Sequence, residues 1–147
     1  MRIRKEDYME NLPYLYGQLL KAADELHELY CDVVRDGQKP QELVGSSMFR
    51  SVSESPLRML PVLSQRIMPY YAWAKVYRRK SDNENRKHAA RAGWLYRVCE
   101  QIATRLWNSQ TVPSRFNDEE KAQLFIGYLA SFSEKEMKLE EESNHES

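Results

Sequence analysis

Cysteine, glycine and long apolar runs are scarce in this chain of 147 residues, and each scarcity excludes a class of protein. Two cysteines are too few for a disulfide scaffold, and Cys31 and Cys99 fit a reducing compartment. Five glycines and six prolines exclude a collagen-like or low-complexity chain. No apolar run reaches the roughly 18 residues of a membrane span, and the charged start from Met1 to Asp7 lacks the apolar centre of a signal peptide. We therefore expect a soluble cytoplasmic domain.

Net charge is also absent, because 22 basic side chains balance 22 acidic ones, yet the two signs are separated along the chain. Residues 50–115 carry 13 basic and 4 acidic side chains, a balance of +9. Residues 116–147 carry 3 basic and 9 acidic side chains, and residues 1–36 carry 5 and 8. Such segregation either presents a positive face to an anionic partner or pairs oppositely charged segments within a helical bundle. Composition alone leaves both interpretations open.

Apolar residues recur at helical spacing through most of the chain, and no period-2 alternation of a β-strand competes with them. The clearest helix covers residues 12–35, with Asn11 as its N-cap, Pro13 in its first turn and Gly37 at its end. Its predicted inner stripe consists of Leu12, Tyr16, Leu19, Ala23, Leu26, Tyr30 and Val33.

The rest of the chain predicts further helices separated by turns. Residues 46–52 predict one short helical turn, and Pro56 opens a helix that Pro61 and Pro69 are expected to break or kink. A turn at residues 81–85 precedes a helix ending near residue 108, with the inner stripe His88, Ala92, Leu95, Cys99, Ile102 and Leu106. A capping box from Asn117 to Glu120 opens the last helix, whose predicted apolar face is Leu124, Phe125, Tyr128, Leu129 and Phe132.

The predicted fold class is all-α, a compact helical bundle of about four to five helices with a frayed acidic C-terminal tail. Residues 1–147 form a single helical domain, with an N-terminal lead at 1–10, the bundle at 11–132 and the acidic tail at 133–147. Gly17 and Gly127 interrupt helical segments, where each costs about 1 kcal/mol relative to alanine. We interpret both glycines as positions where another helix packs closely.

Side chains that carry catalysis or hold metals form no recognisable set. The sequence has no glycine-rich phosphate loop, zinc ligand set or nucleophile elbow. His27 and Cys31 lie one helical turn apart, but two ligands do not complete a zinc site, so we expect an apolar filler and a partly exposed histidine. His88 is expected to be buried and hydrogen-bonded. We predict no catalytic residue, no metal and no cofactor.

A basic segment from Lys75 to Arg91 favours a more specific function. Lysine and arginine gain affinity for phosphates by releasing counterions, and the aromatic residues just upstream are of the kind that stacks on unpaired bases. Those aromatics are Tyr70, Tyr71, Trp73 and Tyr77; for Tyr71 and Trp73 we favour the alternative, burial in the core. The predicted nucleic-acid-binding residues are Lys75, Arg78, Arg79, Lys80, Arg86, Lys87 and Arg91.

Three stretches carry a resemblance to a known family. Residues 14–20 read YLYGQLL, residues 48–56 read MFRSVSESP with a second proline at Pro61, and residues 118–128 read DEEKAQLFIGY. In this order and approximate spacing, over about residues 12–132, they resemble the C-terminal helical region of the type I-C CRISPR large subunit. In that family the region is also made separately, as the small subunit of the Cascade surveillance complex.

The resemblance implies a non-catalytic helical bundle in a prokaryotic cytoplasm, with no membrane and no small-molecule substrate. Its implied partners are guide-RNA-bound backbone subunits, the large subunit, further copies of itself and the displaced non-target DNA strand of the R-loop. The strand would be held by sequence-independent contacts, because guide pairing reads the sequence. A helical protein–protein interaction module without nucleic-acid binding is the alternative, and a small helical enzyme or metal protein is a third.

Overall fold

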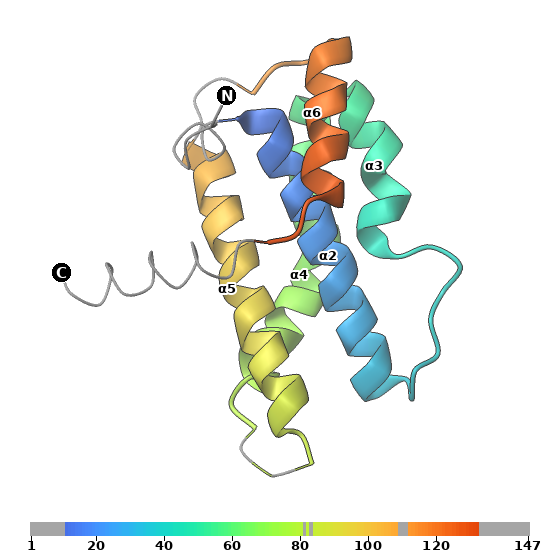
Figure 1. The fold of residues 1–147 in the computed structure, drawn as a ribbon, viewed down its shortest axis with the longest axis vertical. Helices are drawn as coiled ribbons and strands as arrows, with labels where there is room; N and C mark the ends of the chain where they lie inside the picture. The colour runs from blue at the N-terminus through green and yellow to red at the C-terminus, as the bar shows by residue number, and fades with distance from the viewer. Residues whose placement is uncertain (1–10, 81, 83, 109–111, 133–147) are drawn as a thin grey trace, which may run out of the picture.

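Five helices make up the described part of the computed structural model, which comprises residues 11–80, 82, 84–108 and 112–132 (Figure 1). They are α2 (Leu12–Val34), α3 (Val44–Glu54), α4 (Pro56–Tyr77), α5 (Arg86–Asn108) and α6 (Asp118–Leu129). No strand occurs among these residues, so the prediction of an all-α bundle of four to five helices is confirmed. The predicted lead at 1–10 and acidic tail at 133–147 lie outside the described residues.

The central element is α2, which packs against all four other helices. Its N-terminus is capped as predicted, since the Asn11 side chain accepts a hydrogen bond from the Tyr14 N–H. It ends as predicted too: Gly37 takes φ 83° and its N–H donates to the Cys31 carbonyl. The predicted stripe is buried or half-buried, but further faces are buried as well, through Leu15, Leu20, Ala22, Leu29 and Cys31.

Three glycines let other helices approach α2 more closely than any side chain would permit. A Cβ atom on Gly17 would overlap the Leu124 carbonyl of α6, and one on Gly127 would overlap the Tyr14 carbonyl of α2. A Cβ on Gly45, near the start of α3, would overlap the backbone of α2. The prediction that Gly17 and Gly127 are packing positions is therefore confirmed.

Side chains from α2 also complete the C-terminus of α6. The Gln18 amide donates to the carbonyls of Gly127 and Ala130, and the Lys21 ammonium donates to the Ala130 carbonyl at 2.7 Å. The last carbonyls of a helix lack intrahelical partners and carry partial negative charge. An amide and a cation supplied by α2 therefore stabilise this end.

The start of α3 lies earlier than predicted, and its eleven residues replace the single turn expected at 46–52. Two side chains of α2 hold its first amides: the Val44 N–H donates to His27 Nδ1 at 3.0 Å, and the Ser46 N–H donates to Asp24 Oδ1 at 2.9 Å. Both acceptors are distant in the sequence, so the local pattern around residue 44 does not reveal this N-terminus.

The predicted break in α4 is wrong, because the helix continues from Pro56 to Tyr77 with Pro61 and Pro69 inside it. Both prolines are exposed. On the solvent side, water can hydrogen-bond to the carbonyl that a proline leaves without a donor, which lowers the cost of proline there. The sequence does not show on which side of the helix each proline lies.

Two corrections concern the inner faces of α5 and α6. His88 is exposed instead of buried, and Ala89 takes its place at the start of the inner stripe, whose other predicted members are buried as expected. The capping box of α6 is confirmed. Its buried face is narrower than predicted, because Phe125 and Leu129 are 52% and 60% exposed. The glycine contact brings α6 against α2 along a narrow strip that leaves these two side chains outside.

Candidate nucleic-acid interface

The predicted basic segment spans the connection between α4 and α5 and the adjoining ends of both helices, at one end of the long axis of the molecule (Figure 1). Two hydrogen bonds among three side chains hold this connection together. The Tyr77 hydroxyl donates to Asn85 Oδ1 at 2.8 Å, and the Asn85 amide donates to Asp82 Oδ2 at 2.7 Å. The backbone carbonyl of Asn85 accepts a hydrogen bond from the Ala89 N–H, and this bond closes the first turn of α5. We call residues 75–91 the basic hairpin.

Most of the predicted binding residues lie on the exposed surface of the basic hairpin. Its sequence contains seven basic side chains and two acidic ones, Asp82 and Glu84, a balance of +5. Five of the basic side chains are exposed and form no ion pair with any residue that the structure describes. These five are Lys75, Arg79, Lys80, Arg86 and Lys87.

Arg86 and Lys87 occupy the first turn of α5, where positive charge opposes the helix dipole. No acidic side chain offsets them in that turn. The unpaired amides of a helix N-terminus attract anions, and the two cations add to this attraction. The arrangement is unfavourable for the isolated helix and favourable for a bound phosphate.

The other two predicted residues, Arg78 and Arg91, contact the protein itself. The Arg78 Nε donates to the Lys75 carbonyl at 3.0 Å, and its guanidinium lies 4.5 Å from the centre of the Tyr96 ring. Arg91 Nη2 is 3.3 Å from Glu25 Oε1 on α2. Burial raises the pKa of Glu25, and the charge of Arg91 opposes that increase. Both arginines therefore stabilise the bundle at the edge of the basic hairpin.

The aromatic residues upstream of the basic hairpin are used for packing. Tyr71 stacks on Tyr96 with ring centres 4.6 Å apart, and Trp73 stacks on Tyr77 at 4.9 Å. Tyr70 packs against the core as well, with its ring stacked on His27. Tyr71 and Trp73 pack against the core as predicted, but both are half-buried, so their expected burial is confirmed only in part. The basic hairpin therefore exposes cations, while these four aromatic rings are packed against the protein.

One buried polar cluster was missed by the sequence analysis. The Asp24 carboxylate on α2 accepts hydrogen bonds at 2.5 Å from the Ser46 hydroxyl of α3 and from the Tyr128 hydroxyl of α6. Burial and the bond to Asp24 raise the pKa of Tyr128. Because the three groups satisfy one another, the cluster links three helices, and the residues lie too far apart in sequence for a motif to reveal it.

The candidate metal residues have separate structural roles. His27 is half-buried and its Nδ1 accepts from the Val44 N–H, while Cys31 is buried, both as expected. Burial raises the pKa of the Cys99 thiol to about 12, so Cys99 stays protonated. Within the described ranges, no group of three His, Cys, Asp or Glu side chains is arranged to hold a metal ion.

Among the described helices, none combines the length and the apolar character needed to cross a membrane. No family model, curated protein or solved structure matches this chain. The function proposed below therefore rests on the basic hairpin and on the sequence resemblance.

Proposed function

We propose that this chain is a non-catalytic helical subunit that holds nucleic acid by its phosphate backbone through the basic hairpin. One observation carries the proposal: five exposed cations gather at one end of the molecule with no ion-pair partner among the described residues. Two of them oppose the dipole of α5, which an arrangement selected for stability alone would avoid.

Contacts of this kind provide affinity without sequence readout. Cations that neutralise phosphates release bound counterions, and this entropy gain is the same for any base sequence. Recognition of single-stranded bases requires protein side chains that contact the base edges or stack on the base rings. The aromatic side chains near the basic hairpin are instead packed against the protein itself. The basic hairpin is therefore suited to a strand whose sequence another component reads.

The specific assembly that we propose is the type I-C CRISPR Cascade, with this chain as its small subunit. The support is the resemblance of residues 14–20, 48–56 and 118–128, combined with a helical bundle that presents cations at one end. In that role the chain packs along guide-RNA-bound backbone subunits beside the large subunit and further copies of itself. The basic hairpin then stabilises the R-loop by contacting the displaced non-target strand.

The test begins with assembly. The tagged chain is expressed with a type I-C guide-RNA backbone and large subunit, and the intact mass of the purified complex gives its copy number. Target-DNA binding is then compared between wild type and a variant with Arg79, Arg86 and Lys87 changed to Glu. A matched control changes Arg35, Arg50 and Arg115 to Glu, since these are also exposed and alter net charge equally.

We expect incorporation at defined stoichiometry and at least about tenfold weaker DNA binding for the hairpin variant only. Equal weakening in both variants would mean that net charge alone matters and would overturn the hairpin interface. A chain that binds single-stranded DNA but does not co-purify would retain the interface and lose the Cascade assignment.

A helical protein–protein interaction module without nucleic-acid binding is the second candidate. It is favoured by two exposed apolar regions, one on α6 around Phe125 and Leu129 and one on α4 around Met68. This candidate predicts complex formation that is unchanged by the hairpin variant, with no measurable DNA binding.

A further inference from the structure

The last residue that the structure describes, Phe132, packs against α5. The Phe132 side chain is buried, and its ring meets the Trp94 ring edge-on with 5.4 Å between the ring centres. The Lys21 ammonium of α2 lies 5.3 Å from the centre of the Phe132 ring. The chain therefore crosses from the end of α6 to α5 (Figure 1), and the acidic tail, residues 133–147, starts beside Trp94.

The point where the acidic tail starts lies on the same side of α5 as cations of the basic hairpin. Lys87 precedes Trp94 by seven residues, close to two helical turns. The two side chains therefore lie on nearly the same side of α5, about 10 Å apart along its axis. Arg91 comes between them, and its guanidinium lies 4.6 Å from the centre of the Trp94 ring. Positive charge thus continues from the start of the acidic tail to Lys87.

The acidic tail is long enough to reach the basic hairpin both as a helix and as an extended chain. Its three consecutive acidic residues, Glu140, Glu141 and Glu142, follow Phe132 by eight to ten residues. Eight residues cover about 12 Å as a helix and about 26 Å as an extended chain. Both lengths exceed the distance along α5 from the start of the tail to Lys87.

The charges of the two segments are complementary. The acidic tail carries six glutamates and two lysines, a balance of −4, against +5 for the basic hairpin. The five exposed cations of the hairpin have no ion-pair partner among the described residues. Two neighbouring acidic side chains have other partners, since Glu25 pairs with Arg91 and Asp82 accepts a hydrogen bond from the Asn85 amide.

Attachment to the same chain favours contact between the two segments. Ion pairs between exposed side chains each contribute little on their own. A tether of about ten residues, however, holds the tail near the hairpin at an effective concentration in the millimolar range. Several weak ion pairs that form together at this concentration keep the hairpin occupied for much of the time.

We propose that the acidic tail binds the basic hairpin of its own chain and competes with nucleic acid for it. The inference rests on the proposed function, because it assigns a regulation to the same surface. Nucleic acid binds only those molecules whose hairpin is free. A tail that is bound about four-fifths of the time therefore weakens the apparent affinity about fivefold.

Neutralising the tail in the full chain tests the competition. The tail variant carries Glu140→Gln, Glu141→Gln and Glu142→Gln. Its matched control makes the same change of net charge at exposed side chains outside the tail and the hairpin, with Glu54→Gln, Asp118→Asn and Glu119→Gln. Thermal melts verify that both variants fold.

Binding of a fluorescent oligothymidine strand of about 20 nucleotides is measured by anisotropy. We expect the tail variant to bind this strand about fivefold more tightly than wild type. The control should gain less than about twofold, because its charges lie away from the hairpin.

Carbodiimide cross-linking reports the tail contact in the absence of nucleic acid. This reagent joins a carboxylate to an amine that it touches, and the hairpin offers Lys75, Lys80 and Lys87. Mass spectrometry of digested wild type should identify links from residues 140–142 to Lys80 or Lys87. An excess of the oligothymidine strand should remove most of these links, and links to Lys80 should decrease in the hairpin variant.

The results separate this inference from the proposed function. Equal affinities of wild type and the tail variant, with both binding the strand, would overturn the inference and leave the proposed function intact. An equal gain in the control would reduce the effect to net charge and would overturn the inference too. Binding by neither protein would overturn the proposed function and, with it, the competition.

Cross-linking has two outcomes that contradict the inference. Links from residues 140–142 mainly to Lys21, Lys39 or Lys121 would show that the tail binds another surface. Covalent dimers without links inside one chain would show that the tail binds the hairpin of a second copy.

Discussion

At the scale of single residues, glycine sets the distance between helices. Gly127 of α6 contacts the backbone of α2 at Tyr14, where a Cβ atom has no space. We predict that Gly127→Ala lowers the free energy of unfolding by about 2 kcal/mol, because overpacking a rigid backbone contact outweighs the better helix propensity of alanine. Urea denaturation measures the change.

Gly93 provides the matched control for this prediction. A Cβ there would make ordinary contacts, 3.4 Å from the Arg78 Cβ and 3.5 Å from Arg97 Nη1. Gly93→Ala should therefore keep or raise stability, by up to about 1 kcal/mol. If Gly127→Ala denatures at the same urea concentration as wild type, the close contact does not limit the packing of α6.

His27 makes stability depend on pH. Burial lowers its pKa below the ordinary value of 6.5, and its Nδ1 accepts the first N–H of α3 only while it is unprotonated. The unfolded chain therefore binds a proton more readily than the folded one, so this contribution is complete above about pH 6.5 and is lost as the pH falls through the folded pKa. We predict that His27→Gln is less stable than wild type at pH 7.5 by about 1 kcal/mol, and that the difference shrinks by pH 5.

Comparison of the two proteins removes the effect of other titrating groups. Glu25, for example, has a raised pKa, so its contribution to the free energy of unfolding increases as the pH falls, and both proteins contain it. Unfolding free energies at several pH values provide the test. A difference between wild type and His27→Gln that stays constant from pH 7.5 to pH 5 would show that the imidazole does not act as the acceptor.

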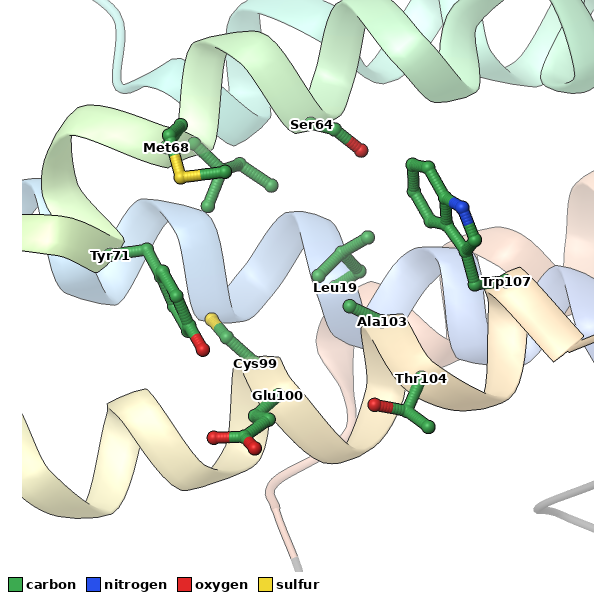
Figure 2. A pocket seen from close by; sticks show the side chains of 10 residues that line it. Leu19, Ser64, Met68, Tyr71, Cys99, Glu100, Ala103, Thr104 and Trp107 are labelled. Atoms are coloured by element: carbon green, nitrogen blue, oxygen red, sulfur yellow. The ribbon is translucent and has the colours of Figure 1, made fainter. Parts of the chain in front are cut away.

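At the scale of helices, local signals predicted some boundaries, and contacts between helices determined the others. Asn11, Gly37 and the Asn117–Glu120 capping box act within one turn of the chain, so the sequence predicts both ends of α2 and the start of α6. The start of α3 depends on Asp24 and His27 from another helix. The basic hairpin was predictable because its charges are contiguous, whereas the pocket between α4 and α5 combines residues of three helices (Figure 2).

Replacing the two cations in the first turn of α5 is expected to change stability and DNA binding in opposite directions. Arg86 and Lys87 oppose the helix dipole, so replacing both with Glu should stabilise the isolated protein by about 1 kcal/mol. The same variant should bind single-stranded DNA several-fold more weakly, because two phosphate contacts are lost. Thermal denaturation and anisotropy titration are measured on the same preparation. A loss of both stability and binding would indicate that the two side chains have a structural role instead.

At the scale of the whole molecule, two oppositely charged surfaces lie far apart. The basic hairpin lies at one end of the long axis, and the acidic first turn of α6, with Asp118, Glu119 and Glu120, lies toward the other (Figure 1). The ion pairs found among the described residues leave the five exposed hairpin cations unneutralised. The basic hairpin and the acidic first turn of α6 are therefore separated in space as well as in sequence, and the unneutralised cations of the basic hairpin favour approach of a polyanion to that end.

This arrangement makes a quantitative prediction about salt. If the five exposed cations each neutralise one phosphate of a single strand, the logarithm of the binding constant should fall with the logarithm of salt concentration with a slope of about −3.5. Raising the salt from about 50 to about 150 mM should then weaken binding about fifty-fold, equally for strands of different sequence. Changing Arg79, Arg86 and Lys87 to Glu removes three of these contacts and should flatten the slope to about −1.4 or less. Anisotropy titrations on two unrelated oligonucleotides measure both slopes. A slope that the variant leaves unchanged would place the phosphate contacts on another surface, even if wild type binds DNA well.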